Sequence, residues 1–314
     1  MTEKTSVLFP GQGSQYVGMG EDLYNAYAEV RELFEQASDL LKIDMKGLCF
    51  KGPDEVLKQT ENAQPAVTLV NAACYAVLRK EGYAPAAAAG HSLGEYSALY
   101  AAGVFDFASL MRTVRQRGIF MQEAADKNPG GMLAVMGLPM EKVIEVCASL
   151  KESTPVEIAN YNSPRQVILT GEAEAIENAA ALAKKAKGLV IKLKVSGPWH
   201  SRFMAGARAA MEEFLKGVTV EKASIPVVSN VTADYMTEPD EIKRNLVDQI
   251  TCPVRWTDSI ARLLGDGNRS FVEAGPGKVL KGLMREINKE VKTYNIENTD
   301  TLKAFVSEGL APGA

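Results

Sequence analysis

A serine with glycines on both sides is the strongest chemical signal in the sequence. The pentapeptide GHSLG at 90–94 has the pattern G-x-S-x-G and lies between an expected strand at 86–90 and an expected helix. A sharp strand-turn-helix elbow needs glycine at its flanks, because side chains there would collide with neighbouring backbone, and it exposes the serine hydroxyl for nucleophilic attack. The alternative is an ordinary turn in which Ser92 only caps the helix. The placement between strand and helix favours the nucleophile.

A nucleophilic serine needs a base, and the sequence holds two histidines, His91 and His200. Consecutive side chains diverge at a tight elbow, so His91 is poorly placed to take the hydroxyl proton of Ser92. His200 follows turn residues 196–198 at an expected domain junction, where a side chain can point across a cleft. A lone histidine beside Trp199 would ordinarily be a partly buried structural residue. Because no other histidine competes for the role, we predict that His200 is the base.

A glycine-rich loop, FPGQGSQ at 9–15, follows the first expected strand. Tyr16 stands where the third glycine of a G-x-G-x-x-G dinucleotide motif belongs, and GPGK at 275–278 lacks the spacing of a P-loop. Both modes of nucleotide binding are therefore disfavoured. Loops at the carboxyl ends of central strands carry ligand-facing groups in α/β folds, so the backbone N–H of Gln12 is a candidate donor to an oxyanion.

Arg117 lies in an amphipathic helical pattern, with Arg112 and Arg115 nearby in the sequence. The ordinary interpretation of such a residue is a solvated basic face. The functional interpretation is an anchor for a charged substrate. Helical spacing alone does not decide between the two.

Composition narrows the classes of function. The 314 residues carry 35 basic and 39 acidic side chains, for a formal charge of -4, which is too anionic for a nucleic-acid binder that works through a global positive field. The four cysteines are scattered with no CxxC pair, so we expect neither a disulfide framework nor a metal site.

No apolar signal segment opens the chain, and its most apolar long stretch, 63–78, is too short and polar to span a bilayer. We expect a cytoplasmic protein with no membrane and no nucleic-acid partner.

Short apolar runs that end in Gly and lead into helical patterns indicate an α/β protein with a mainly parallel sheet. Strands are expected at 5–9, 86–90, 226–228, 270–273 and 291–294, and helices at 63–80 and 201–215. The helix at 63–80 is apolar enough to be buried, and Gly82 stands where its C-terminal cap belongs. We assign a larger α/β-hydrolase-like domain to residues 1–127 and 198–314.

Between residues 128 and 197 the pattern changes to the order βαββαβ, the split arrangement of ferredoxin-like modules. Strands are expected at 132–136, 156–159, 167–170 and 189–195, with helices at 140–150 and 172–186. Turn residues stand at both edges, at 128–131 and 196–198. We predict a small ferredoxin-like subdomain at 128–197, inserted into the larger domain.

Seven segments together resemble one family, the malonyl-CoA:acyl carrier protein transacylases of type II fatty acid synthesis. In chain order they are FPGQGSQ at 9–15, AQPA at 63–66, GHSLGEY at 90–96, QRG at 116–118, N-x-NSP-x-Q at 160–166, PWHS at 198–201 and E-x-GPG at 273–277. They run nearly end to end, and several such motifs in this order are specific for the family.

The resemblance implies roles for the residues that match these motifs. Ser92 would be acylated, His200 would be its base, and Arg117 would bind the free carboxylate of malonate. The oxyanion hole would be formed by the backbone N–H groups of Gln12 and Leu93.

The resemblance also implies that a main-chain carbonyl orients the base, so that no triad Asp is required. Here that carbonyl belongs to Gln249, ahead of PVRW at 253–256. Further substrate contacts would come from Gln64, Met121, Asn160 and Trp199. Trp199 stands where many relatives carry Phe, and it keeps the site bulky, which suits malonyl over a branched group.

The implied activity is transfer of a malonyl group from malonyl-CoA to the phosphopantetheine thiol of acyl carrier protein. It would follow a ping-pong mechanism through malonyl-Ser92, in a protein that we expect to be a monomer. The CoA thioester is a substrate, and no cofactor or metal is implied. The carrier protein could equally serve a polyketide pathway with the same chemistry.

Functions of other classes remain as alternatives. A serine esterase or thioesterase shares the elbow, but it would normally carry an Asp or Glu between Ser and His and an HGGG-like loop, which is absent. A Ser-Asp acylhydrolase would need Asp266-Gly267, which is most simply a polar turn. A non-catalytic scaffold for acyl carrier protein is disfavoured because Ser92, His200 and Arg117 occur together.

Overall fold

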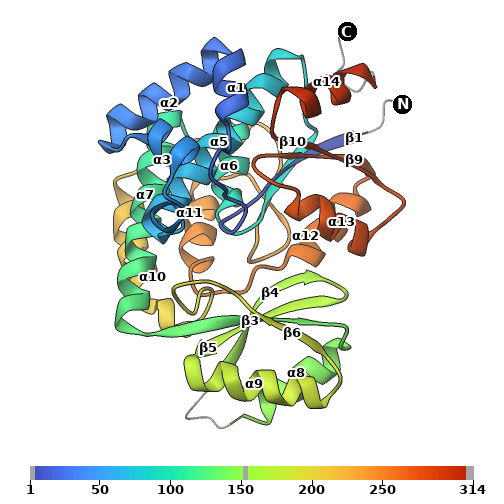
Figure 1. Cartoon of the computed structure of the whole chain (residues 1–314). Helices are drawn as coiled ribbons and strands as arrows, with labels where there is room; N and C mark the ends of the chain where they lie inside the picture. Colours follow the sequence, from blue (N-terminus) through green and yellow to red (C-terminus); the bar gives the residue numbers. More distant parts are fainter. Residues whose placement is uncertain (1–3, 151–154, 309–314) are drawn as a thin grey trace.

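Two β-sheets organise the chain in the computed structural model, which describes residues 4–150 and 155–308 (Figure 1). The larger sheet has six strands in the order β10-β9-β1-β2-β7-β8. Its strands are β1 (Lys4–Phe9), β2 (Ala87–Gly90), β7 (Val227–Val228), β8 (Tyr235–Met236), β9 (Asn268–Ala274) and β10 (Lys292–Ile296). Neighbours pair in parallel except β7 and β8, which are antiparallel.

The smaller sheet has four strands in the order β4-β5-β3-β6, and all of its pairs are antiparallel. Its strands are β3 (Gly130–Met136), β4 (Val156–Ser163), β5 (Gln166–Glu172) and β6 (Leu189–Lys192). Two helices, α8 (Met140–Ala148) and α9 (Ala173–Lys185), cover the face that lies away from the larger sheet (Figure 1). The fold is therefore mixed α/β, with one parallel-rich sheet and a separate antiparallel sheet.

Further helices lie around the larger sheet (Figure 1). They are α1 (Glu21–Ala26), α2 (Ala28–Leu41), α3 (Met45–Lys51), α4 (Asp54–Leu57), α5 (Thr60–Lys80), α6 (Gly94–Ala101), α7 (Phe107–Lys127), η1 (Arg202–Met204), α10 (Ala205–Lys216), α11 (Pro239–Asp248), α12 (Trp256–Gly265), α13 (Val279–Ile287) and α14 (Thr299–Ser307). Within 4–150 and 155–308, no helix combines the length and the apolar character needed to cross a membrane.

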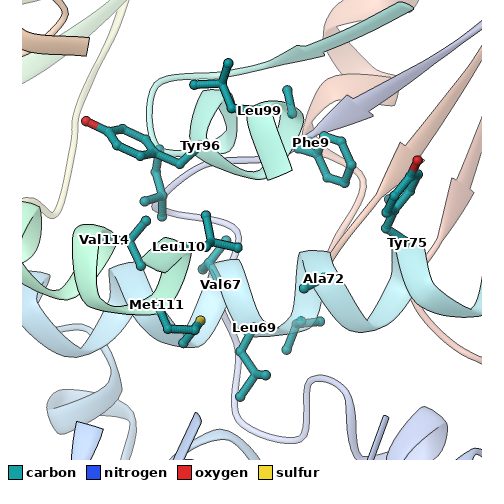
Figure 2. Close-up of a cluster of buried hydrophobic side chains, with 14 of the residues drawn as sticks. Phe9, Val67, Leu69, Ala72, Tyr75, Tyr96, Leu99, Leu110, Met111 and Val114 are labelled. Atoms are coloured by element: carbon teal, nitrogen blue, oxygen red, sulfur yellow. The ribbon is translucent and has the colours of Figure 1, made fainter. Parts of the chain in front are cut away.

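The main core forms where β1, α5, α6 and α7 meet. Figure 2 shows Phe9 of β1 beside α6 and Tyr75 of α5, with Val67 of α5 next to Leu110 of α7. Most residues of α5 are buried, which confirms the buried helix that its apolar pattern predicts. Removal of this much apolar surface from water is the main force that holds the helices on the sheet.

The helices α5 and α7 approach each other closely at Gly118. A Cβ added to Gly118 would lie 2.9 Å from both the Glu61 Cα and the Thr60 carbonyl oxygen at the start of α5. The third position of the QRG segment therefore serves helix packing. The close approach also brings Arg117 of α7 beside Gln64 of α5.

The smaller sheet alternates its side chains between two environments, as a strand with period two requires. Leu133 and Val135 of β3 point into a separate apolar core with α8 and α9. Met132 and Ala134 point the other way, where they line a cleft facing the larger sheet. This sheet thus has its own core and also forms one wall of a cavity.

Several elements differ from the sequence-based expectation. The strand expected at 189–195 ends at Lys192, and residues 193–195 line the cleft. The helix expected at 201–215 starts as the short 3-10 helix η1 before α10. The two-residue strand β8 was not expected, since it is too short to show a period-two pattern.

We predict opposite effects for alanine at two helical glycines. Gly118→Ala should destabilise the fold by about 1–3 kcal/mol, because the added Cβ meets backbone of α5. Gly206→Ala in α10 is the matched control: its Cβ meets nothing within 4 Å, so it should stabilise the helix by up to about 1 kcal/mol. Urea unfolding monitored by circular dichroism measures both values. Equal effects at the two positions would contradict the packing role of Gly118.

Candidate active site

Ser92 occupies a strained elbow between β2 and α6. Its φ is 50°, in the left-handed region that residues with a Cβ rarely adopt. A Cβ at Gly90 would overlap the backbone of Gly94, and a Cβ at Gly94 would overlap the carbonyl oxygen of Phe9. Both glycines of the G-x-S-x-G segment are therefore required by backbone contact, as the pattern predicts.

His200 lies within hydrogen-bond distance of the nucleophile. Its Nε2 is 2.7 Å from the Ser92 Oγ, and its Nδ1 is 2.8 Å from the main-chain oxygen of Gln249. A carbonyl oxygen only accepts hydrogen bonds, so the Nδ1 carries the proton and the Nε2 of the neutral ring is left to accept the proton of Ser92. A main-chain carbonyl thus takes the orienting role that an acid has in a Ser-His-Asp triad.

The environment of His200 keeps its ring neutral. Burial and the positive charge of Arg117 lower the pKa of His200 to about 3. The imidazole is therefore free to act as a base at every physiological pH.

The side chain of Arg117 reaches the Ser92 hydroxyl from α7. Its Nη2 donates to the Ser92 Oγ at 3.2 Å and to the Gln249 Oε1 at 2.9 Å, and its Nη1 donates to the Gln64 Oε1 at 2.9 Å. The side chain is only 1% exposed, which excludes the solvated basic face considered above. Its hydrogen-bond partners are neutral, and no carboxylate among the described residues forms an ion pair with it. A buried guanidinium held only by neutral groups is suited to receive an anionic ligand.

Two backbone N–H groups are free to stabilise an oxyanion. Within the described residues, no hydrogen bond occupies the N–H of Gln12 or that of Leu93 at the start of α6. The N–H of Ser92, by contrast, is bonded to the Asn230 Oδ1 at 2.7 Å. A Cβ at Gly11 would overlap the His91 carbonyl oxygen, so the glycine-rich loop lies directly against the elbow. This contact brings the Gln12 and Leu93 segments together.

A cleft of about 1080 Å³ opens over Ser92 and is lined from both sheets. Its lining includes the sequence-predicted residues Gln12, Arg117, Met121, Asn160 and Trp199, together with His200. Such a volume is in the range of natural ligand pockets.

Gln64 is not among the lining residues of the cleft. It is fully buried and its Oε1 holds the guanidinium of Arg117 from behind. The structure therefore gives Gln64 a place beside the anion anchor, whereas the sequence-based expectation was a direct substrate contact. A helix-to-helix approach at Gly118 sets this position, and one-dimensional spacing does not reveal it.

The side chain of His91 hydrogen-bonds to Asn162 and not to Ser92. Its Nε2 is 2.8 Å from the Asn162 Oδ1, and its ring packs edge-on against Trp256 at 5.5 Å. Asn162 in turn donates to the Gln166 Oε1 at 2.9 Å, which gives the N-x-NSP-x-Q segment a structural part in the cleft wall. The geometry agrees with the prediction that side chains diverge at the elbow.

Three residues of the site were missed in the sequence. Asn230 bonds the Ser92 N–H, Glu95 contacts Asn230 and Gln249, and Asn162 holds His91. Asn230 follows the carboxyl end of β7, which is where α/β sheets place functional side chains, so this position was the available signal. Glu95 and Asn162 belong to the GHSLGEY and N-x-NSP-x-Q segments, but the sequence alone indicated no role for either side chain.

Other chemistries find little support in the geometry. Asp266, the candidate of a Ser-Asp hydrolase, lies 3.5 Å from the Arg262 guanidinium and has no hydrogen bond to Ser92 or His200. Across the part of the chain that the structure describes, no cluster of three or more His, Cys, Asp or Glu side chains has the arrangement of a metal site.

Comparison with known proteins agrees with this site. The chain matches the model of the acyl transferase domain family over residues 7–301. The chain belongs to the acyl transferase family. It is 41% identical to the malonyl CoA-acyl carrier protein transacylase of Bacillus subtilis over 305 residues, which cover 96% of either protein. The resemblance in the seven segments is thereby confirmed, and the chain is an acyltransferase enzyme.

Relatives from a second pathway within the acyl transferase family are equally similar. The polyketide biosynthesis malonyl CoA-acyl carrier protein transacylase PksC of Bacillus subtilis is 43% identical over 290 residues, which cover 91% of this chain and 97% of that protein. Among solved structures, a malonyl-transacylase in complex with its type II PKS acyl-carrier protein superposes with a TM-score of 0.94 at 37% identity, covering 97% of this chain and 99% of that chain. Identity therefore does not separate the two pathways.

We predict that the acylation rate of Ser92 stays constant as the pH falls from 8 to 5. The neutral ring is the base and its pKa is about 3, so protonation removes the base only below this range. A histidine of ordinary pKa, about 6.5, would lose about 30-fold in rate by pH 5. Stopped-flow release of CoA in the first turnover measures the rate. An acid limb with a midpoint near 6.5 would contradict the proposed environment of His200.

Proposed function

We propose that the chain transfers a malonyl group from malonyl-CoA to the phosphopantetheine thiol of acyl carrier protein. The single observation that carries the acyl choice is Arg117, a buried guanidinium with neutral partners, 3.2 Å from the Ser92 Oγ. An acyl group on Ser92 that ends in a carboxylate can pair with this cation, and an unsubstituted acyl group cannot. The relatives described above are malonyl CoA-acyl carrier protein transacylases, which supports the same donor and acceptor.

The first half-reaction acylates the enzyme. His200 Nε2 takes the proton of the Ser92 Oγ while that oxygen attacks the thioester carbonyl of malonyl-CoA. The carbonyl oxygen becomes an oxyanion that accepts from the N–H groups of Gln12 and Leu93. The intermediate collapses when the carbon–sulfur bond breaks, and His200 returns the proton to the CoA sulfur. The products are malonyl-Ser92 and free CoA.

The second half-reaction reverses these steps with another thiol. His200 takes the proton of the phosphopantetheine thiol, the thiolate attacks the malonyl ester, and the oxyanion forms again in the same hole. The carbon–oxygen bond to Ser92 then breaks and the proton returns to the Oγ. One set of groups serves both half-reactions because the leaving group of the first and the attacking group of the second are both thiols.

Arg117 holds the malonyl group by its free carboxylate. A guanidinium can bind a carboxylate with two parallel hydrogen bonds, with a geometry that Lys cannot reproduce. Gln64 and Gln249 fix its orientation through their side-chain oxygens. Met121, Asn160 and Trp199 form nearby parts of the cleft, and we propose that they limit the size of the acyl group.

We further infer that residues 128–197 form a ferredoxin-like subdomain inserted into an α/β-hydrolase-like domain of residues 1–127 and 198–314. The inference is supported by the element order β3-α8-β4-β5-α9-β6, by the separate apolar core and by the antiparallel pairing. Residues 1–3, 151–154 and 309–314, which fall within these ranges, lie outside the described residues. The inserted unit would supply one wall of the cleft.

Cofactor need, oligomeric state, cellular location and the pathway of the carrier protein are further parts of the proposal. We propose that the reaction needs no cofactor besides the CoA thioester, because Ser92, His200 and Arg117 already supply a nucleophile, a base and an anion anchor. A monomer located in the cytoplasm also stays a prediction. Whether the carrier belongs to a fatty acid or a polyketide pathway is decided by assaying both carriers. A thioesterase would release free malonate in place of malonyl carrier protein.

We predict that Ser92→Ala abolishes covalent malonylation. Incubation of the wild-type chain with a mixture of acyl-CoAs, followed by intact mass measurement, should show one added malonyl group and the preferred acyl chain together. The Ala variant lacks the attacking oxygen, so its mass should not change. A malonylated Ala variant would refute the nucleophile.

We predict that Arg117→Ala changes the choice of donor. Loss of one partner of a buried, hydrogen-bonded charge pair costs about 2–5 kcal/mol, so kcat/KM for malonyl-CoA should fall by at least about 30-fold. The value for acetyl-CoA, which has no carboxylate, should change far less. Arg115→Ala is the matched control, because Arg115 lies on the same helix and binds Asn62 at 2.9 Å outside the site. An unchanged ratio between the two donors in Arg117→Ala would refute the carboxylate role.

A further inference from the structure

Glu95 is a fully buried carboxyl group directly behind the nucleophile elbow. It lies in the first turn of α6 and does not line the cleft. Its Oε2 accepts two hydrogen bonds, from the Asn230 backbone N–H at 2.9 Å and from the Gln249 Nε2 at 3.0 Å. Its Oε1 has no partner among the described residues. A carboxyl group in this environment is costly to bury, so its presence calls for a function.

Asn230, the first partner of Glu95, clamps the elbow. Its Oδ1 accepts from the Ser92 N–H at 2.7 Å, and its Nδ2 donates to the Gly90 carbonyl oxygen at 2.8 Å. The clamp stabilises the left-handed backbone of Ser92 and occupies the Ser92 N–H. The N–H of Leu93 is left as the free donor.

Gln249, the second partner, contacts all three chemical groups of the site. Its main-chain oxygen accepts a hydrogen bond from the Nδ1 of His200, and its side-chain Oε1 accepts one from Arg117. Its Nε2 donates to the Ser92 carbonyl oxygen at 2.9 Å and also to Glu95. The Gln249 NH2 group therefore has two acceptors, the Ser92 carbonyl oxygen and Glu95, while the Gln249 Oε1 faces the guanidinium of Arg117.

We propose that Glu95 is a positioning residue whose Oε2 fixes Asn230 and the amide orientation of Gln249, and through them the elbow and the guanidinium of Arg117. The inference deepens the proposed function and rests on it. An amide can rotate by half a turn and exchange its oxygen and nitrogen. A rotated Gln249 would place its NH2 group against the guanidinium of Arg117, donor facing donor, and Glu95 opposes this rotation by accepting one of the amide hydrogens.

The role needs an acceptor oxygen and does not need a negative charge. Burial raises the pKa of Glu95 to about 7, so the group exists in both protonation states near neutral pH. A proton on the unpartnered Oε1 leaves the Oε2 as a carbonyl oxygen that still accepts both hydrogen bonds. Glutamine at this position can present its oxygen in the same place, whereas leucine fills the volume without an acceptor.

The test compares Glu95→Leu with Glu95→Gln. A fluorophosphonate probe reacts with an activated serine without a thioester, and its labelling rate of Ser92 reports the elbow and the base independently of the acyl substrate. We expect Glu95→Leu to label about 10-fold to 100-fold more slowly and to lose most of its preference for malonyl-CoA over acetyl-CoA. We expect Glu95→Gln to stay within about threefold of wild type in both measurements.

A matched control separates positioning from a loss of stability. Asn268 is a buried polar residue at the opposite end of the larger sheet, where it accepts from the Ser6 Oγ at 2.7 Å and donates to the Leu263 oxygen at 2.9 Å. Asn268→Leu also removes two buried hydrogen bonds and should lower the melting temperature while the labelling rate and donor preference of the folded protein stay unchanged. All rates are measured where thermal melts show each variant folded.

Each result has a definite meaning. Labelling and donor preference of Glu95→Leu equal to wild type would overturn the proposal, and so would a Glu95→Gln variant as slow as Glu95→Leu. Gln249→Met tests the same link without changing Glu95, because it removes the amide and keeps the main-chain oxygen that holds His200; full retention of the donor preference would again overturn the proposal. If the wild-type chain reacts with the probe and not with malonyl-CoA, the proposed function fails while the labelling comparison still decides the role of Glu95.

Discussion

Direct contact of backbone with backbone at the nucleophile elbow is the constraint on which the site depends. The glycine-rich loop after β1, the turn after β2 and the first turn of α6 meet with no Cβ between them at Gly11, Gly90 and Gly94. Strained backbone such as that of Ser92 persists only where its surroundings determine it fully. The same contacts bring the unpaired N–H groups of Gln12 and Leu93 to the elbow, so a single packing arrangement supports both the proposed nucleophile and the proposed oxyanion donors.

The second organising feature is the guanidinium of Arg117, which is hydrogen-bonded only to neutral oxygens. Arg117 is held by the amides of Gln64 and Gln249, so its position is fixed while its charge remains available to an incoming anion. Glu95 interacts with Arg117 electrostatically but does not hydrogen-bond to the guanidinium, so no ion pair occupies these donors. The same cation lowers the proton affinity of His200, so in the proposed mechanism substrate choice and base strength both depend on one side chain.

Much of the composition of the candidate site could be predicted from the sequence, because it consists of residues with distinctive types. Ser92 is marked by its glycines, and His200 was assigned as the only base left once His91 was excluded. The central strands and the buried helix α5 followed from apolar patterns. Arg117 could not be distinguished from its less buried neighbours Arg112 and Arg115 by spacing, since its burial depends on how α7 crosses α5. Gln64, Glu95 and Asn230 act through contacts between segments far apart in the chain. Their partners could therefore not be read from the sequence, although Gln64 and Glu95 lie in segments shared with the family.

In the proposed mechanism, the low proton affinity of His200 also affects the timing of proton transfer. An imidazolium with a pKa of about 3 is a strong acid, so the ring cannot store the proton of Ser92 in the resting enzyme. The ring holds that proton only while a negatively charged oxygen forms nearby and offsets the positive charge. Transfer of the proton and attack on the carbonyl are therefore coupled in time, and the serine remains a neutral alcohol between turnovers. An idle enzyme with this arrangement carries no permanently reactive alkoxide that could be consumed by unrelated electrophiles.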